Sequence, residues 1–234
     1  PDTVERAVRS ALAQSEDVHV VVFGDGEAPP LSQVRDSRLD VHTSAVNRGT
    51  YFCHQAMILA NPHPWHAVID ADDWVEPAHL ERMAALGSDA VATGSIWWHR
   101  QGVAPRVWTG PSGRHAYYHV GRFATERLRA FGGYDPQERV GQDTVVLRLL
   151  RMTGGLLRWA PQDPTYHRDW RPGSLTTSAM TGHRSPERAA AKRRNAEVYA
   201  AAAKLKTADA IRAWRQARIR SEVAEALAVE VDRL

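Results

Sequence analysis

The sequence feature that most constrains the fold is the apolar run Val18–Phe23, which only His19 interrupts. The run is nearly continuous and does not alternate apolar with polar residues, so it predicts a strand covered on both faces. Strands of this kind are typical of parallel sheets with helices on both sides. The run stops at Gly24-Asp25-Gly26, where glycine lets the backbone approach a ligand. We therefore expect an α/β protein with ligand contacts at the carboxyl ends of its strands.

Helical and strand patterns alternate along the chain, as in domains built of helices packed on a sheet. Helical spacing of apolar residues is found in 3–15, 51–59, 77–86, 124–132 and 143–150, and short apolar runs predict strands at 18–23, 39–42, 66–69, 89–93, 96–98, 115–123 and 156–160. A Gly/Pro-rich stretch, 101–113, is expected to be a loop. The prediction is a mostly parallel sheet flanked by helices, followed by a C-terminal helical extension in two stretches, 186–204 and 208–233.

Three carboxylates crowd the end of the apolar run 66–69, at Asp70, Asp72 and Asp73. Like charges this close raise one another's protonation cost unless a cation or hydrogen bonds compensate. Carboxylate oxygens suit a hard cation such as Mg²⁺ or Mn²⁺. One acid, Asp73 foremost, could instead cap the helix that begins near Pro77. Capping uses one carboxylate, so Asp70 and Asp72 are the predicted metal ligands.

The segment Asp70-Ala71-Asp72-Asp73 resembles the Asp-x-Asp motif of family 2 glycosyltransferases, which are inverting sugar-nucleotide enzymes with the GT-A (Rossmann-like) fold. Further segments resemble this family in the same order along roughly residues 4 to 180: 11–15 with the valine run and Asp25-Gly26, Asn47-Arg48-Gly49, Gly132-Gly133-Tyr134-Asp135, Gly141-Gln142-Asp143, and the closing stretch 166–176. The resemblance implies a further strand ahead of residue 1. Gly24 and Glu27 depart from the family's Asp-Asp-Gly-Ser turn.

On the donor side, the resemblance implies that Asp25 contacts the base or ribose of a nucleotide sugar, most simply a UDP-sugar. The other implied donor contacts are Arg48, Asp70, Asp72, Arg168 and Arg171. Arg48 has the open alternative of being solvated, although arginine suits phosphate wherever it is presented. The resemblance also implies a divalent cation, Mn²⁺ or Mg²⁺, held by Asp72, Asp70 and His167.

On the acceptor side, the resemblance makes Asp143 the general base, whereas from the residue alone it could simply stabilise the first turn of a helix. Gln142 replaces the family's usual Glu at a position that contributes to acceptor binding. Trp97 and Trp98 offer flat faces on which sugar rings can lie, or else they pack in the core. The acceptor is expected to be a glycan, a lipid-linked sugar or a protein.

Composition limits the other classes of function. The chain has 234 residues and a formal net charge of +3, which suits one main domain, and we expect no nucleic-acid partner. Cys53 is the single cysteine, so no internal disulfide is expected and a reducing cytoplasm fits. No apolar run approaches the length of a membrane-spanning helix. The expected location is cytoplasmic, with peripheral membrane contact as an option.

The expected organisation is a sugar-nucleotide-binding half, 1–104, an acceptor-binding and catalytic half, 105–182, and the extension, 183–234. In the extension, Ile219, Val223, Leu227, Val231 and Leu234 form an apolar stripe. That stripe packs on the main domain or pairs with another subunit in a homo-oligomer. A basic cluster near the start of the extension is a solvated face, or meets an anionic acceptor or a membrane.

The function predicted from the sequence is transfer of a sugar from a nucleotide-sugar donor to an acceptor hydroxyl, with inversion at C1 and with a divalent metal. Two alternatives stay open. A sugar nucleotidyltransferase would usually carry a Gly-rich phosphate loop, which this sequence lacks. A catalytically silent carbohydrate- or partner-binding module on the same fold is favoured by the departures at Gly24 and Gln142.

Overall fold

The structure is a computed structural model, which describes residues 2–87, 89–92, 95–108, 120–159, 164–172, 174, 178–182 and 184–234. Residues 109–119 of the expected loop and strand, and most of the expected closing motif after Arg171, lie outside this part of the chain. Two compact units are present. The first comprises Pro1–Ser44, Ala67–Phe123 and Leu157–Arg171, and the second comprises Ala45–His66, Ala124–Leu156 and Pro172–Leu234. The division into functional stretches at 104 and 182 stays a prediction.

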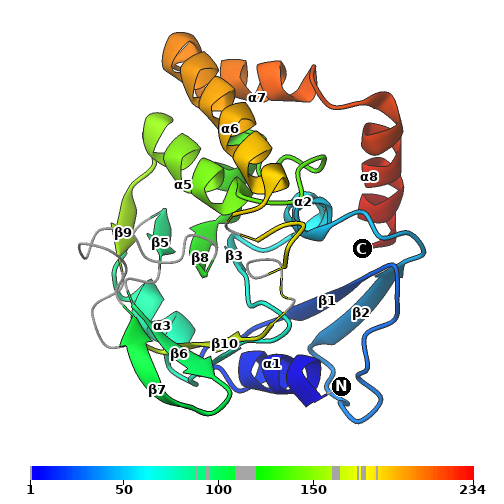
Figure 1. Ribbon diagram of the computed structural model, residues 1–234, viewed down its shortest axis with the longest axis vertical. Coiled ribbons are helices and arrows are strands. Elements are labelled where there is room, and N and C mark those ends of the chain that lie inside the picture. Colours follow the sequence, from blue (N-terminus) through cyan, green and yellow to red (C-terminus); the bar gives the residue numbers. More distant parts are fainter. Residues whose placement is uncertain are drawn as a thin grey trace. The chain divides into compact units, whose positions relative to one another are not determined.

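The first unit begins with the helix and strand that the sequence predicted. Helix α1 (Asp2–Leu12) is followed by strands β1 (Val20–Asp25) and β2 (Leu39–Ser44), which pair in parallel (Figure 1). Val8 of α1 packs with Leu31 and Val34 in a small core, and apolar residues of β1 and β2 lie against it. The valine run thus forms a strand with one face under α1.

A second sheet of the first unit has the strand order β4-β10-β6-β7. Its strands are β4 (Trp74–Val75), β6 (Ile96–Arg100), β7 (Val103–Trp108) and β10 (Tyr166–Trp170). Strand β10 runs parallel to β6 and antiparallel to β4, and β6 and β7 form an antiparallel hairpin. The buried side chains of Val75, Ile96, Val120 and Tyr166 form the core under one face.

The remaining strands of this unit are β5 (Ala90–Ala92), β8 (Gly121–Ala124) and β9 (Leu157–Trp159), with helix α3 (His79–Ala84) before them. Strand β5 pairs antiparallel with β8 and parallel with β9. Strand β3 (Trp65–Ala67) spans the boundary between the two units. Both larger sheets thus combine parallel with antiparallel pairs, so they are mixed, and this corrects the expectation of a mostly parallel sheet.

Several strands differ from the sequence prediction. The strand before the acids ends at Ala67 and does not include Val68 and Ile69. The expected loop 101–113 contains β7, because Gly102 adopts φ +73° in the hairpin turn and Pro105 lies on an edge strand. An edge strand tolerates proline, because at a position that points away from the sheet a backbone N–H would have no pairing partner. Strands β4 and β10 were also not expected.

The second unit is helical, with α2 (Thr50–Ala60), α4 (Thr125–Ala130), α5 (Gln142–Met152), α6 (Pro186–Leu205), α7 (Ala208–Gln216) and α8 (Ser221–Arg233). The single expected helix 208–233 is two helices. Gln137 holds the break between them, because its side chain accepts from the N–H of Arg220 and donates to the carbonyl of Arg218. Helix α8 packs against α2, with Val223 and Leu227 buried, so the apolar stripe packs within the unit.

Within the part of the chain that the structure describes, none of the helices combines the length and the apolar character that crossing a bilayer requires.

Candidate active site

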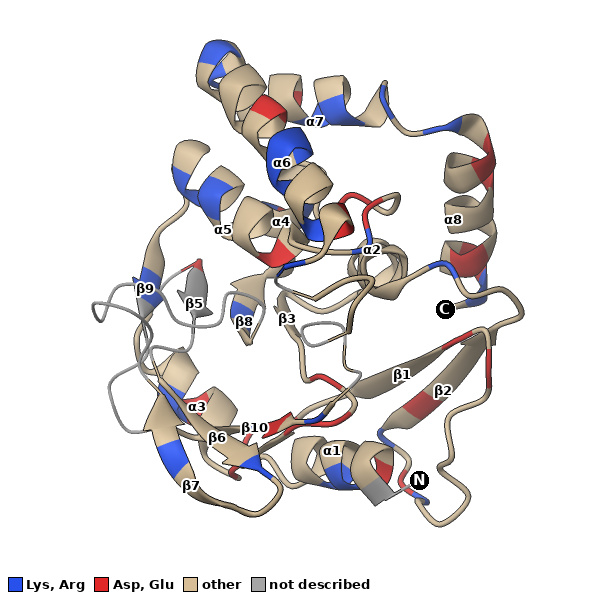
Figure 2. Ribbon diagram, in the orientation of Figure 1, with Lys and Arg blue, Asp and Glu red and all other residues tan. Residues whose placement is uncertain are grey.

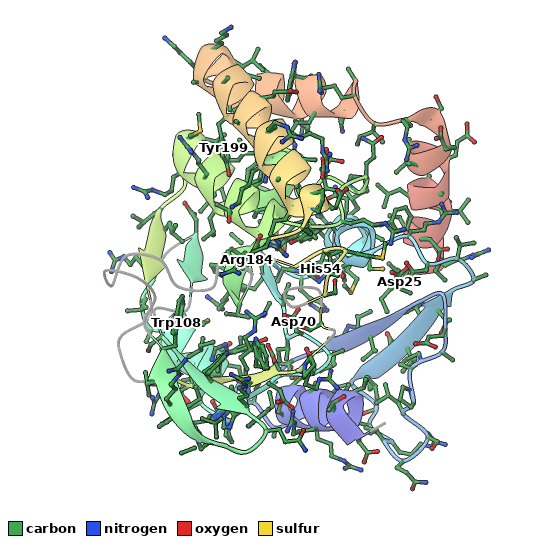
Figure 3. All side chains as sticks on the ribbon, viewed as in Figure 1. Asp25, His54, Asp70, Trp108, Arg184 and Tyr199 are labelled. Carbon is green, nitrogen blue, oxygen red and sulfur yellow. The ribbon has the colours of Figure 1, made fainter. Side chains whose placement is uncertain are left out.

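The turn Asp70–Asp73 gathers the three acids that the sequence singled out. One carboxylate oxygen from each of Asp70, Asp72 and Asp73 lies within 4.8 Å of the other two. The N–H of Asp73 donates to the carbonyl of Asp70 over 3.0 Å, which closes the turn just before β4. Asp70 and Asp72 are half-buried (Asp70 is labelled in Figure 3). Two half-buried carboxylates on one tight turn offer the oxygen ligands that a hard divalent cation prefers.

Asp73 fixes this turn to the sheet. Its carboxylate is 2% exposed and accepts hydrogen bonds from the Tyr166 hydroxyl (2.8 Å) and from the N–H of Asp169 (2.9 Å). Burial raises the pKa of Asp73 to about 7, and the charges of Asp70 and Asp72 add to this effect. Both of its oxygens are thus occupied within the protein. The alternative that Asp73 caps the next helix is wrong, because α3 begins at His79 with no side-chain cap bond.

Tyr166 is the second structural residue of the turn, and the sequence analysis did not assign it a role. Its side chain is fully buried, and its hydroxyl also accepts from the N–H of Asp70 over 3.3 Å. Burial raises its pKa well above the usual value for tyrosine, so the hydroxyl keeps its proton. Recognising β10 as a strand would have placed Tyr166 on the face opposite to His167 and so marked it as a core residue.

Two arginines of the first unit contact the turn. The Nη2 atom of Arg171 donates to Oδ2 of Asp72 over 3.0 Å, so the structure brings these two predicted donor-binding residues together. The Nη2 atom of Arg6 donates to the carbonyl of Asp72 over 2.8 Å and to Asp169 over 3.2 Å. Arg6 also stacks on Trp74, with its Cζ 3.7 Å from the ring centre. No sequence pattern pointed to Arg6, which lies on α1, far away in the chain.

His167 belongs to a different cluster from the three acids. Its Nδ1 lies 3.0 Å from Nε2 of His99, its Nε2 lies 3.3 Å from Glu76, and its ring stacks on Trp74. Burial lowers the pKa of His167, an effect that Glu76 opposes. Because side chains alternate along β10, His167 faces away from Tyr166 and the acid turn. The structure therefore does not group His167 with Asp70 and Asp72.

The two tryptophans lie on opposite faces of β6. Trp97 stacks on His167 with ring centres 6.2 Å apart, whereas Trp98 lies beside Trp170 and packs against the core under the other face. Arg168 stands on β10 directly opposite Trp98. The structure thus separates the two predicted sugar contacts.

Asp25 ends β1, where it pairs with Ser44 of β2, and the N–H of Gly26 donates to the carbonyl of Ser44 (Figure 3). A half-buried acid at the carboxyl end of a parallel strand is well placed to contact a ligand. The departure at Gly24 has a steric cause. A Cβ there would lie 2.2 Å from the carbonyl oxygen of Glu27 and 2.9 Å from Pro29, so this turn does not accommodate an Asp.

In the second unit, Asp143 lies in the first turn of α5, after Gly141 with φ +81°. The Tyr51 hydroxyl donates to its Oδ1 over 3.5 Å, and Tyr51 stacks on Tyr134. Burial, followed by the charge of Asp143, raises the pKa of Tyr51 well above its usual value. Asp143 itself is half-buried. It combines a helix N-terminus, which favours the carboxylate form, with a protonated tyrosine that orients one oxygen.

Gln142 is a structural residue. Its side chain is 1% exposed, its Oε1 accepts from the N–H of Asp135 (3.3 Å), and its Nε2 donates to Asn195 of α6 (3.1 Å). Asn195 in turn donates to the carbonyl of Gly141. Gln142 was predicted to contact the acceptor, but almost none of its side chain is exposed, so it is not proposed to bind the acceptor.

Arg48 precedes α2, and its guanidinium lies 5.3 Å from the ring centre of Phe52. The next residue, Gly49, has φ +97° and forms the N-cap of α2. The structure thus places Arg48 at a helix N-terminus, where backbone N–H groups favour an anion.

Two curated proteins of Rhizobium meliloti (strain 1021) are similar to part of the chain. The succinoglycan biosynthesis protein ExoU is 35% identical over 98 residues, which are 39% of this chain and 29% of that protein. The succinoglycan biosynthesis protein ExoO is 40% identical over 87 residues, which are 35% of this chain and 25% of that protein. The similarity thus spans less than a third of either relative's length. No protein-family model matches the chain.

Solved structures share the fold at low sequence identity. TarS 1–349 of S. aureus in complex with UDP-GlcNAc has a TM-score of 0.60 at 13% identity, over 74% of this chain and 56% of that one. GalNAc-T7 with UDP, GalNAc and Mn²⁺ has a TM-score of 0.60 at 11% identity, over 84% of this chain and 46% of that one.

The chain has the GT-A fold, as the sequence predicted. Together with the two succinoglycan biosynthesis proteins, this fold confirms the resemblance to family 2 glycosyltransferases.

Proposed function

We propose that the protein is an inverting glycosyltransferase that moves a sugar from a nucleotide-sugar donor to an acceptor hydroxyl with the help of a divalent cation. The acid turn carries this proposal, because Asp73 and Tyr166 hold Asp70 and Asp72 in one place with their carboxylates half-buried. The GT-A fold supports it, since TarS with the same fold was solved with UDP-GlcNAc and with UDP.

Asp70 and Asp72 are the residues proposed to hold the cation, and Arg171 is proposed to contact the donor diphosphate. A bound Mn²⁺ or Mg²⁺ would neutralise charge that grows on the leaving diphosphate. Arg171 already touches Asp72, so it lies where it can exchange that carboxylate for a phosphate oxygen. Carboxylate oxygens suit both Mn²⁺ and Mg²⁺, and GalNAc-T7 was solved with Mn²⁺.

Asp143 is proposed as the general base that takes the proton of the acceptor hydroxyl as its oxygen attacks C1. Its place at the start of α5 supports this role, because a negative charge is stabilised at a helix N-terminus and the Tyr51 hydroxyl orients one carboxylate oxygen. Asp25 is proposed to contact the nucleoside, most simply uridine, and Arg48 a phosphate. The sugar and the acceptor follow from pocket shape, which the fold does not determine.

Donor binding and turnover can be measured separately. The melting temperature is recorded with UDP or UDP-GlcNAc, each with Mn²⁺, with Mg²⁺ or with EDTA, because a ligand that binds the native state raises it. Slow release of UDP from UDP-GlcNAc is then followed with water as the acceptor. We expect metal-dependent stabilisation and metal-dependent hydrolysis by the wild type, and loss of both in Asp72→Asn.

The same experiment distinguishes the two alternatives. A silent binding module would be stabilised by a sugar or nucleotide and would release no UDP. A nucleotidyltransferase would release pyrophosphate when UTP and a sugar 1-phosphate are supplied. Either result would contradict the proposed transfer.

A further inference from the structure

A row of alternating arginine and tryptophan side chains crosses three neighbouring strands of the first unit. The Cζ atom of Arg106 lies 4.4 Å from the ring centre of Trp98, the Trp98 and Trp170 ring centres are 6.0 Å apart, and Arg100 lies 4.4 Å from the ring centre of Trp170. Arg106 comes from β7, Trp98 and Arg100 from β6, and Trp170 from β10 (Figure 1). We call these four residues the Trp–Arg row.

The row begins where the buried core of the sheet ends. On the same face, Ile96 and Tyr166 are buried, Trp98 and Trp170 are half-buried, and Arg100 and Arg106 are exposed. The row lies at the carboxyl ends of the parallel strands β6 and β10, the edge of a sheet at which α/β proteins place their ligands.

The row also leads toward the acid turn. Arg171 follows Trp170 directly and donates to Asp72. The N–H of Asp169, in the last part of the same strand, donates to Asp73. A chain-like ligand that lies along the row would therefore reach the acid turn, which lies beside the end of β10.

Among the residues that the structure describes, neither Arg100 nor Arg106 forms an ion pair with an acid. Residues 95–108 contain no Asp or Glu, and Figure 2 shows the basic colour on β7. Stacking on an indole uses the flat face of the guanidinium and leaves its in-plane N–H donors available for a bidentate anion. An arginine pair that is pre-ordered on aromatic rings loses little side-chain freedom when it binds.

We propose that the Trp–Arg row binds an acceptor glycan that carries carboxylate groups. Arg100 and Arg106 pair with the carboxylates, and the indole edges contact the apolar C–H surface of the sugar rings. A neutral glycan would use the tryptophans and leave both cations without a counter-charge. The proposal rests on the proposed glycosyltransferase function, because it names the chemical class of that enzyme's acceptor.

The test measures glycan binding by isothermal titration calorimetry, with a galacturonate oligomer as the acidic probe and a malto-oligosaccharide of equal length as the neutral one. The double variant Arg100→Gln/Arg106→Gln removes two positive charges from the row. Arg151→Gln/Lys204→Gln removes two exposed positive charges from α5 and α6 and serves as the matched control. Circular dichroism confirms that each variant folds, and the single variants replace a double variant that does not.

We expect the wild type to bind the acidic oligomer more tightly than the neutral one. The row variant should lose about tenfold or more in affinity for the acidic oligomer, as expected for hydrogen bonds to charged groups, while the control variant stays within about twofold of the wild type. Added salt should weaken the binding of the acidic oligomer, because it screens exposed charges.

Equal affinity of the wild type for both oligomers, or equal losses in the row and control variants, would overturn the proposal. Release of UDP by the wild type in the absence of glycan tests the proposed function independently. Glycan binding by the row without any UDP release would support the glycan site and contradict the proposed glycosyltransferase activity. UDP release without selective binding of the acidic oligomer would support the activity and contradict the glycan site.

Discussion

The acid turn of the first unit and the start of α5 in the second unit each hold a half-buried carboxylate in place, but they do so with different residues. In each, a buried polar side chain, Asp73 or Gln142, joins separate segments of the chain, and a neighbouring carboxylate stays half-buried. Asp73 bonds to Tyr166 and to the backbone of β10, whereas Gln142 bonds to the backbone of Asp135 and to Asn195. One joining residue is an acid and the other is a neutral amide.

This difference has a physical consequence. Burying the Asp73 carboxylate penalises its charged form and raises its pKa, and the nearby acids increase the penalty. A cation at Asp70 and Asp72 would relieve that repulsion, so the first region is expected to respond to metal. Gln142 carries no charge, so the second region holds Asp143 without any such dependence. In both regions, the residue that positions the site is distinct from the residue proposed to act in it.

Asp143→Asn is expected to have the largest effect. Removing a general base should lower kcat by about 10²- to 10⁴-fold. Donor binding should be unchanged, since Asn keeps the size of the side chain and can accept the Tyr51 hydroxyl bond. Initial rates of transfer and titration calorimetry with UDP measure the two quantities. A variant that turns over at the wild-type rate would remove the assignment of Asp143 as the base.

Asp72→Asn should act on metal-dependent binding. Replacing a proposed ligand should weaken the binding of UDP with Mn²⁺ by about 10- to 100-fold or more, the range seen when even the partners of metal ligands are changed. Binding of UDP in EDTA should be affected less, and this measurement is the control. Equal weakening with and without Mn²⁺ would show that Asp72 contacts the donor without holding a cation.

The sequence predicted the features that depend on local patterns and missed those that depend on contacts between distant segments. The acid turn was visible because three carboxylates after an apolar run are rare and costly, and α1, β1 and α2 followed from local patterns of apolar residues. Strands β7 and β10 were missed because their pairing partners decide them, and Pro105 suggested a loop. Tyr166 and Arg6 reach the turn from 93 and 66 residues away, and no local spacing reports such contacts.

His167 and Gln142 show the limit of reasoning from a family motif. His167 lies on β10, a strand that the sequence did not predict, and the alternation of side chains along this strand turns it toward His99 and Glu76. Gln142 stands at the position of an acceptor-binding Glu, but its side-chain amide bonds to Asp135 and Asn195 inside the protein. A motif fixes positions along the chain, whereas the direction of each side chain depends on the elements packed around it.

Gln142→Leu should be less damaging than the two Asp substitutions and should act on stability. It leaves the N–H of Asp135 and the Oδ1 of Asn195 without their buried partner, at a cost of about 1 to 3 kcal/mol in the free energy of unfolding. Tyr166→Phe, which deprives Asp73 of its hydroxyl partner, should cost a similar amount. Urea unfolding measures both. Only Tyr166→Phe should also weaken metal-dependent donor binding, because Tyr166 holds the acid turn.

The smallest expected effect is the pH dependence that His79 contributes to the first region. His79 packs beside Tyr166, is 2% exposed and has its pKa lowered to about 4, mainly by burial and then by the charge of His167. The unfolded chain binds a proton at this histidine near pH 6.5, whereas the folded chain does so only near pH 4. Stability from this group is therefore present above pH 6.5 and is lost as the pH falls between these values.

His79→Gln removes that titration while keeping a polar partner for Thr165, whose Oγ1 lies 2.7 Å from Nδ1 of His79. The wild type should lose up to about 2 kcal/mol more than the variant in unfolding free energy between about pH 7 and pH 5. Urea unfolding at the two pH values measures this difference. The gap between wild type and Gln142→Leu should stay constant over the same range, because an amide does not titrate. If that gap also changed at the lower pH, the contrast between a titrating His79 in the first region and a non-titrating Gln142 at the start of α5 would be wrong.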